Sequence, residues 1–215
     1  MTKISLCMVV RNEGKRLPKL FGICKEFVSQ IVVFDQDSDD NTVDVCREHN
    51  AYIHKTTRKS LADSDRQDCY NIATGDMVLA LDGDEYPDTK LRNLLKGIKE
   101  GKPEYDVYWF KFLNLVNGVD IKEVLGDDWH PRLWVRNDTR PPVVIWPDKA
   151  HTFPQINTQN VIFWERGKIV HDRLFKNIKA THENRVKVID PQNQDVERNF
   201  INAVSSILDR KGVRH

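Results

Sequence analysis

The sequence lacks several features that would assign it to a particular class of protein. Its 215 residues include 4 cysteines, none in a C-x-x-C pair, and no apolar run approaches the length of a membrane span. Lys and Arg total 33 against 32 Asp and Glu, so no charge excess favours nucleic acid or an anionic membrane as a partner. The opening MTKISLCMVV is too short for a signal peptide and lacks a small-residue cleavage site. These absences predict a cytoplasmic protein whose cysteines are buried free thiols.

The composition is that of a folded domain with one sizeable core. Apolar residues make up 40% of the chain and charged residues 30%, which is too apolar for disorder. The sequence has no internal repeat and no low-complexity linker. We therefore expect a single domain over residues 1–215, with halves at 1–100 and 101–215 that differ in pattern. Whether this domain is one module of a longer protein is left open.

In the first half, short apolar runs alternate with helical patterns. Helices are expected at residues 17–29, just after 41, at 62–74 and around 91–98. Strands are expected at Ile4–Val10, Ile31–Phe34, Tyr52–Lys55 and Met77–Leu81, of which the third has the weakest pattern. This order predicts an α/β fold with right-handed crossovers and a largely parallel, Rossmann-like sheet. Since ligands bind beyond the carboxyl ends of such strands, the polar segments there are expected to line one cleft.

The second half has a different pattern. Residues 105–113 alternate, with Val107, Trp109 and Lys111 on one side, which predicts a strand with one exposed face. Short strands are expected around 132–135, 143–146 and 161–164, and helices at 175–188 and 195–210. We therefore expect this half to be irregular.

Asp82-Gly83-Asp84 directly follows the fourth strand. Two carboxylates one residue apart, on a turn that Gly83 makes flexible, can both contact a hard cation such as Mg²⁺ or Mn²⁺. Such an ion keeps positions for phosphate oxygens and stabilises a departing diphosphate as a Lewis acid. The alternative is a solvated acidic turn, because the D-x-D pattern alone is weak evidence. The position at the end of a buried strand favours the metal site.

Two further segments predict contacts with a nucleotide. Asp35, at the end of the second strand, is placed to accept a hydrogen bond from a base or ribose that lies across the strand tips. Ser38 and Asp40, later in the same polar run, are expected to cap the following helix and shape the turn. Arg66 precedes the D-x-D strand and suits bidentate bonds to a diphosphate; the alternative is an ordinary surface ion pair.

Three histidines fall at predicted strand ends in the second half: His130, His151 and His171. Any of them could complete a metal shell beside the two aspartates, although a single histidine is more often structural. His151 and His171 are the stronger candidates, because both follow apolar strands that can return to the cleft.

Asp127 and Asp128 are candidates for a catalytic base. Transfer to an alcohol needs a carboxylate within hydrogen-bond reach of the acceptor hydroxyl. The adjacent Trp129 offers a flat apolar face that suits a sugar ring. The alternative is an exposed acidic turn beside a core tryptophan.

Three segments resemble family 2 glycosyltransferases of the GT-A fold: ISLCMVVRNE, VVFDQDSDDNT and DRQDCYNIATGDMVLALDGDEYPD. The resemblance implies transfer of a sugar, with inversion, from a nucleoside diphosphate sugar to a hydroxyl of a glycan or glycoprotein. A UDP-sugar is the favoured donor, with Mn²⁺ or Mg²⁺ at Asp82 and Asp84. The residues implied to bind the donor are Val10, Asn12, Glu13, Asp35, Arg66, Asp82 and Gly83.

In the second half, HPRLWVRN and the W-x-x-x-x-H element within Ile145–Thr152 are similar to later segments of the family, as is His171. The sequence departs from the family pattern at Thr152, where relatives often have an acidic residue. This departure moves the expected base to Asp128 or Asp127. Gln36 and Gln67 are further departures, since Asp and Asn are commoner there.

The second half also resembles the transferase domains with which large DNA viruses glycosylate their own capsids, which implies a host-cytoplasmic location. Two other functions fit the same predicted fold. A nucleotidyltransferase needs a Gly-rich, basic loop after the first strand, whereas this position reads RNEGK. A non-enzymatic domain that binds a glycan or a partner protein would not need the Asp82/Asp84 pair, which argues against it.

Overall fold

The computed structural model describes residues 1–57, 63–136, 143–147, 154–180 and 194–213. The chain forms two compact units, one of residues 1–111 and 129–169 and the other of residues 112–128 and 170–215. Two long strands begin in the first unit and end in the second. Among the described residues, no helix combines the length and apolar character that crossing a membrane requires.

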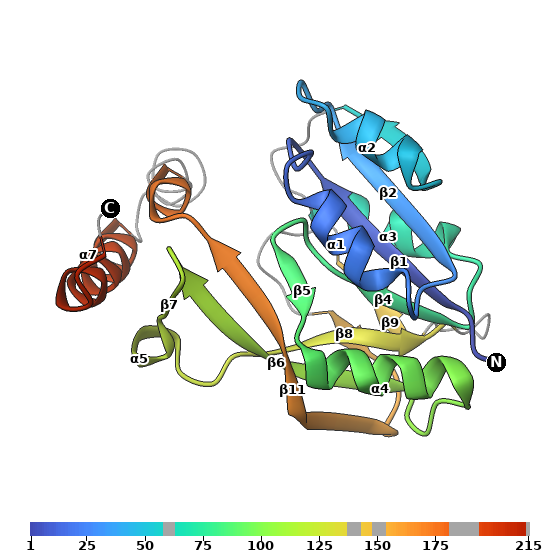
Figure 1. The fold of residues 1–215 in the computed structure, drawn as a ribbon. Helices are drawn as coiled ribbons and strands as arrows, with labels where there is room; N and C mark the ends of the chain where they lie inside the picture. Colours follow the sequence, from blue (N-terminus) through green and yellow to red (C-terminus); the bar gives the residue numbers. More distant parts are fainter. Residues whose placement is uncertain (58–62, 137–142, 148–153, 181–193, 214–215) are drawn as a thin grey trace. The chain divides into compact units, whose positions relative to one another are not determined.

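The first unit is built on a parallel sheet, as predicted. Strand β1 pairs in parallel with β2 and β4, and β2 pairs in parallel with β3 (Figure 1). Every residue of β1 is buried, which is the environment of a strand covered on both faces. The strands are β1 (Ile4–Val10), β2 (Gln30–Gln36), β3 (Tyr52–Thr56) and β4 (Met77–Ala80). Because the order in space is β3-β2-β1-β4, the direction of the winding reverses between β1 and β4.

Helices α1 and α2 lie on one face of this sheet and α3 on the other, as right-handed crossovers require (Figure 1). Their bounds are Leu17–Cys24, Thr42–Glu48 and Asp63–Ile72, and α4 follows at Thr89–Glu100. Helix α1 is shorter than predicted. Phe27 and Val28 both donate backbone hydrogen bonds to the Cys24 carbonyl, so the chain turns toward β2 before Ser29.

The second half continues the sheet and is more regular than expected. Strand β8 is antiparallel to both β4 and β6, and the sheet order is β3-β2-β1-β4-β8-β6-β11-β5. In β6, buried and partly exposed residues alternate as predicted. The prediction for the last strand was too short, because β11 continues to Arg173. The added strands are β5 (Glu85–Pro87), β6 (Val107–Val116), β8 (Trp129–Val135) and β11 (Val161–Arg173).

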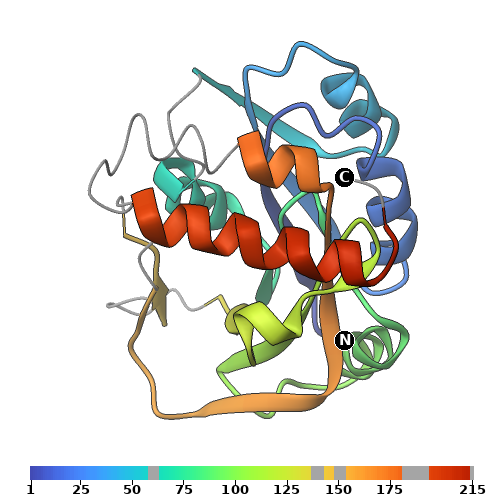
Figure 2. The ribbon, with the colours of Figure 1, turned by 90° about the vertical axis from the view of Figure 1, so that its left-hand side faces the viewer.

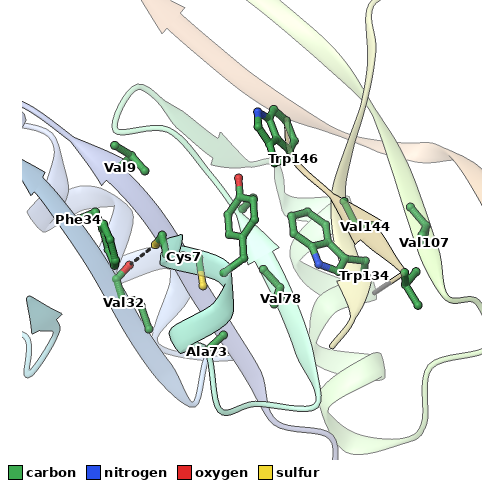
Figure 3. Packing of buried hydrophobic residues seen from close by; sticks show 14 residues of the cluster. Cys7, Val9, Val32, Phe34, Ala73, Val78, Val107, Trp134, Val144 and Trp146 are labelled. Atoms are coloured by element: carbon green, nitrogen blue, oxygen red, sulfur yellow. Dashed lines mark hydrogen bonds between the residues drawn. The ribbon is translucent and has the colours of Figure 1, made fainter. Parts of the chain in front are cut away.

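The core under α3 is aromatic. Tyr70 of α3 packs edge-on against Trp134 of β8, with ring centroids 4.9 Å apart, and against Trp146, at 6.0 Å. Trp146 follows β9 (Val144–Ile145), which pairs with β10 (Gln155–Ile156). Figure 3 shows Trp134, Trp146 and the apolar side chains of β1 and β2 in this cluster. All four cysteines are buried and free, which confirms the prediction for their side chains.

The second unit has a small core of its own. After β6, the turn residues Asn117 and Gly118 both have positive φ, at 49° and 77°, which suits a tight hairpin into β7 (Val119–Asp120). Helix α7 (Gln194–Arg210) lies beside α5 (Lys122–Leu125), and Arg210 pairs with Glu123 at 2.8 Å (Figure 2). The buried core residues are Val116, Ile121, Phe175, Ile178, Val204 and Leu208.

Candidate functional site

The loops that follow β1 and β2 are hydrogen-bonded into one surface. The backbone N–H of Asn12 donates to Ser38 Oγ at 2.9 Å, and the N–H of Asp39 donates to Asn12 Oδ1 at 2.9 Å. The N–H of Glu13 donates to Thr42 Oγ1 at 2.8 Å. Asn12 has a φ of 56°, a conformation that asparagine adopts more readily than most residues. We call this set of bonds the loop clasp.

Asp40 connects the loop after β1 to the start of α2. It accepts hydrogen bonds from the N–H groups of Gly14, at 3.1 Å, and of Thr42, the first residue of α2, at 2.9 Å. Asn41, which directly precedes the helix, makes no side-chain capping hydrogen bond, and Ser38 accepts the N–H of Asn12. A Cβ at Gly14 would collide with the Asn41 side chain, so the close approach of the two loops requires glycine here.

Asp35 is the penultimate residue of β2 and lies beside Val10, its partner across the β1–β2 pairing. Its side chain is almost fully buried, with 1% exposed. Oδ2 accepts a hydrogen bond from the Ser38 N–H at 3.3 Å, whereas Oδ1 has no hydrogen-bond partner among the described residues. A buried carboxylate oxygen without a partner is unfavourable. A ligand hydroxyl or N–H group would satisfy it.

The D-x-D turn is tight and lies against Glu13. The N–H of Glu85 donates to the Asp82 carbonyl at 3.0 Å, and the N–H of Asp82 donates to Glu85 Oε2 at 3.1 Å. A Cβ on Gly83 would lie 2.5 Å from Glu13 Cγ, so glycine allows Glu13 to pack on the turn. Burial raises the pKa of Glu13; Arg16 opposes this, and the charges of Asp84 and Asp82 raise that pKa further. The carboxylates of Glu13, Asp82 and Asp84 therefore lie close enough to affect one another.

Two arginines hold the first aspartate of the turn. Arg66 Nη2 lies 2.8 Å from Asp82 Oδ1 and 3.1 Å from Oδ2. Arg132 Nη2 lies 2.7 Å from Glu85 Oε1 and 3.7 Å from Asp82 Oδ2. The Arg66 side chain is only 9% exposed, so Arg66 is not in an ordinary surface ion pair. Burial would lower the pKa of Arg132, but Glu85 and Asp82 outweigh this effect and raise it, so the guanidinium stays charged.

Sequence reasoning missed Arg132 and Glu85 as members of the site. Both lie in segments that resemble the family, Arg132 in HPRLWVRN and Glu85 in the acidic run after the fourth strand. The sequence did contain a signal for Arg132, which is a charged residue inside the apolar run of β8. A buried arginine needs a buried partner of opposite charge.

The two glutamines that depart from the family pattern connect α3 to its surroundings. Gln36 Nε2 donates to Asp65 Oδ2 at 2.7 Å, and Thr56 Oγ1 donates to the same oxygen at 2.9 Å. Gln67 Oε1 accepts from the backbone N–H of Trp146 at 2.7 Å. Helix α3, which carries Arg66, is thus fixed to β2, β3 and the segment after β9.

The donor groups at the turn fit a divalent cation that is only partly coordinated by protein. Within the described residues, no three or more His, Cys, Asp or Glu side chains are arranged to enclose a metal ion. Asp82 and Asp84 flank Gly83, and both carboxylates are partly exposed. Mg²⁺ and similar ions are commonly held by one or two carboxylates, with substrate phosphates and water in the other positions.

The candidate base and one candidate metal ligand are connected in the second unit. Asn114 Nδ2 donates to Asp128 Oδ2 at 2.9 Å, and Asn114 Oδ1 lies 3.0 Å from His171 Nδ1. Because a carboxylate only accepts hydrogen bonds, the amide nitrogen of Asn114 must face Asp128, and the amide oxygen must accept a hydrogen bond from His171 Nδ1–H. The neutral imidazole of His171 therefore carries its proton on Nδ1 and its lone pair on Nε2. Asn114 is buried and was not predicted.

The remaining candidates are placed as follows. Asp127 is exposed and forms an ion pair with Lys122 at 3.0 Å. Asp127, Asp128 and His171 belong to the second unit, whereas Asp82 and Asp84 belong to the first. His151 lies outside the described residues.

Solved structures define the class to which this sheet and its loops belong. S. aureus TarS, residues 1–349, superposes with a TM-score of 0.56 at 13% identity, covering 94% of this chain and 70% of that one. The same protein in complex with UDP-GlcNAc gives a TM-score of 0.57 at 14% identity, covering 95% and 73% of the two chains. The fold is that of GT-A glycosyltransferases, as predicted.

Residues 5–142 match the family model described as glycosyl transferase family 2. The chain therefore belongs to glycosyl transferase family 2, which confirms the resemblance seen in the sequence.

Curated relatives match parts of the chain, as two of them illustrate. A TPR repeat-containing protein of Synechococcus elongatus is 35% identical over 85 residues, which is 40% of this chain and 21% of that protein. An uncharacterized glycosyltransferase of Rickettsia felis is 26% identical over 121 residues, covering 53% and 40% of the two chains. The matched part of this chain thus spans between about a fifth and two fifths of the length of these relatives.

Proposed function

We propose that this domain transfers a sugar from a nucleoside diphosphate sugar to a hydroxyl group of a glycan or glycoprotein, with inversion and with Mn²⁺ or Mg²⁺ at the D-x-D turn. The observation that carries the proposal is the pairing of two features at one edge of the sheet. Asp35 presents a buried carboxylate oxygen without a partner, and the Asp82–Asp84 turn is held by buried arginines.

The spacing of these features suits a nucleotide. Strand β1 lies between β2 and β4, so the strand ends near Asp35 and Asp82 are about 10 Å apart. A nucleoside on Asp35, Val10 and Asn12 would then extend its diphosphate toward Asp82. The winding of the sheet reverses between β1 and β4, which is where open α/β sheets bind ligands. Because a structure of the same fold holds UDP-GlcNAc, uridine nucleotides are the first donors to test.

Asp82 and Asp84 are the residues that would hold the cation, with Gly83 keeping the turn close to Glu13. The ion would supply Lewis acidity to the departing diphosphate. Arg66 and Arg132 orient the Asp82 carboxylate through their guanidinium groups. Arg66 also adjoins the turn closely enough to be a candidate contact for a phosphate group.

For the second half of the reaction, Asp128 is the better candidate base. Asn114 orients its carboxylate, whereas Asp127 pairs with Lys122 in solvent, with side chains 51% and 61% exposed. A fixed carboxylate can take the proton of the acceptor hydroxyl as that oxygen attacks the sugar. Direct attack in one displacement inverts the anomeric centre. His171, with its lone pair on Nε2, presents a nitrogen of the kind that binds metal ions.

Calorimetric titration of UDP with and without Mn²⁺ tests the donor site. We expect Mn²⁺ to tighten UDP binding at least about tenfold in the wild type and to have no such effect in Asp84→Asn. Lack of binding of both UDP and GDP to folded protein would overturn the proposal. Binding of UDP without transfer or slow hydrolysis of any UDP-sugar would instead support a non-enzymatic domain.

A further inference from the structure

Three aromatic side chains from neighbouring strands meet in the first unit, away from the nucleotide candidates. Trp109 of β6 stacks on Phe163 of β11, with ring centroids 5.2 Å apart and an interplanar angle of 22°. Trp129 of β8 meets the same Phe163 ring edge-on at 5.6 Å. Lys111 Nζ lies 5.7 Å from the centroid of the Trp129 ring. We call Trp109, Trp129 and Phe163 the aromatic platform.

The aromatic platform is anchored in the core but remains open. Trp109 packs against the buried cluster of the first unit, whereas Phe163 is 53% exposed and Trp129 is partly exposed. Aromatic side chains gain most by full burial, so a half-open group of three is costly unless a ligand covers it. Tyr108 and Phe110, on the other side of β6, are buried.

The aromatic platform is joined to the D-x-D turn through one strand. Strand β8 begins at Trp129, and three residues later Arg132 contacts Glu85 and Asp82. At about 3.3 Å per residue, the Cα atoms of Trp129 and Arg132 lie about 10 Å apart along the strand.

We propose that the aromatic platform is an acceptor subsite that holds a pyranose ring of the glycan substrate. The proposal rests on the proposed function. The apolar C–H face of a pyranose matches a flat aromatic ring in shape and polarity, and Lys111 at its margin can donate a hydrogen bond to a sugar oxygen. A protein partner fits less well, because a stable interface covers about 800 Å² on each side. Three partly buried aromatic side chains of about 150–250 Å² each offer far less.

Binding of the wild-type protein to an array of immobilised neutral and acidic oligosaccharides tests the subsite. The variant is Phe163→Ala, and Phe163→Tyr should restore the stacking surface. Tyr52→Ala is the matched control, because Tyr52 is 51% exposed on β3, at the opposite edge of the sheet order. We expect Phe163→Ala to weaken retention on the array at least about tenfold, and Phe163→Tyr and Tyr52→Ala to change it little.

The outcomes separate this proposal from the proposed function. Equal retention of the wild type and Phe163→Ala, or no retention of the wild type on any glycan, would overturn the subsite. UDP titration of the same samples reports on the donor site alone, so loss of UDP binding would count against the proposed function instead. Dimerisation of the wild type in sedimentation, lost in Phe163→Ala, would show that a second copy of the chain covers the aromatic platform and would also overturn the subsite.

Discussion

The guanidinium of Arg132 lies 2.7 Å from Glu85 Oε1, and the two side chains are only 6% and 1% exposed. The other oxygen of Glu85 accepts the backbone N–H of Asp82, so this ion pair supports the D-x-D turn from beneath. Removing one partner leaves a buried charge without compensation, which typically costs about 3–5 kcal/mol, whereas removing both costs much less. We expect Glu85→Gln to lower the free energy of unfolding by about 3 kcal/mol or more, measured in urea. The double variant Glu85→Gln/Arg132→Met should recover part of that loss, and equal stability of all three proteins would contradict this account.

The two aspartates of the D-x-D turn should respond differently to loss of charge. Asp82→Asn removes the carboxylate that Arg66 and Arg132 share, so we expect a loss of about 2–4 kcal/mol in stability. Asp84 is partly exposed, and Asp84→Asn should change stability by less than about 1 kcal/mol while abolishing the effect of Mn²⁺ on UDP binding. Urea unfolding and calorimetry on both variants provide the comparison. A large stability loss in Asp84→Asn would show that its role is structural.

Gly83 should tolerate no side chain. A Cβ there would come within 2.5 Å of Glu13 Cγ, so Gly83→Ala must displace Glu13 or the turn. We expect destabilisation of about 1–3 kcal/mol and at least about tenfold weaker UDP binding with Mn²⁺. Gly22→Ala is the control, because Gly22 lies inside α1 and an added Cβ meets nothing within 4 Å. That variant should be unchanged or about 0.5–1 kcal/mol more stable.

Asn114 should set the tautomer of His171. Long-range ¹H–¹⁵N correlation spectra of the neutral ring are expected to show the proton on Nδ1 in the wild type and a mixture of tautomers in Asn114→Ala. Transferase activity should fall about 10–100-fold in the variant, as is typical when a group that orients a functional histidine is removed. A wild-type ring protonated on Nε2 would contradict the assignment.

The four thiols should be unreactive until the protein unfolds. Burial raises the pKa of Cys24 to about 12 and that of Cys46 to about 12, the latter with a further contribution from Asp35. We expect no reaction with Ellman's reagent at pH 8 in the native state and four thiols released in guanidinium chloride.

The same pKa shifts give stability a defined pH dependence. The unfolded thiols titrate near the ordinary value of 9.0 and the folded ones near 12, so between these values the unfolded state binds fewer protons. The thiol contribution to stability is therefore complete below about pH 9 and is lost as pH rises toward 12. Urea unfolding across this range measures it, and a stability that rises with pH would contradict the burial of Cys24 and Cys46.

Local sequence signals were sufficient for the first half of the fold. Continuous apolar runs predicted β1, β2 and β4 within one or two residues, because a strand buried on both faces needs no polar positions. The end of α1 was missed because Phe27 is buried without being helical, so its apolar side chain imitated helical spacing. The length of β11 was missed because its second part contains polar residues, which are held in a strand by pairing with strands distant in the sequence.

The same limit applies to the candidate site. Asp82 and Asp84 were recognisable from two residues in the right place on the chain. Arg132 and Asn114 were not recognisable, because their partners are distant in the sequence. Glu85 is 47 positions from Arg132, and His171 is 57 positions from Asn114. A buried polar side chain must form hydrogen bonds, but only the folded sheet shows with which residues it forms them.

The loop clasp between Asn12 and the loop that contains Ser38 and Asp39 has a practical consequence for changing donor preference. A backbone N–H group of each loop donates a hydrogen bond to a side chain of the other loop. The conformation of one loop therefore depends on the sequence of the other. An exchange of nucleotide pockets between relatives should therefore transplant residues 11–14 and 37–42 together. Grafting either loop alone would leave peptide groups unbonded on the partner that stays behind.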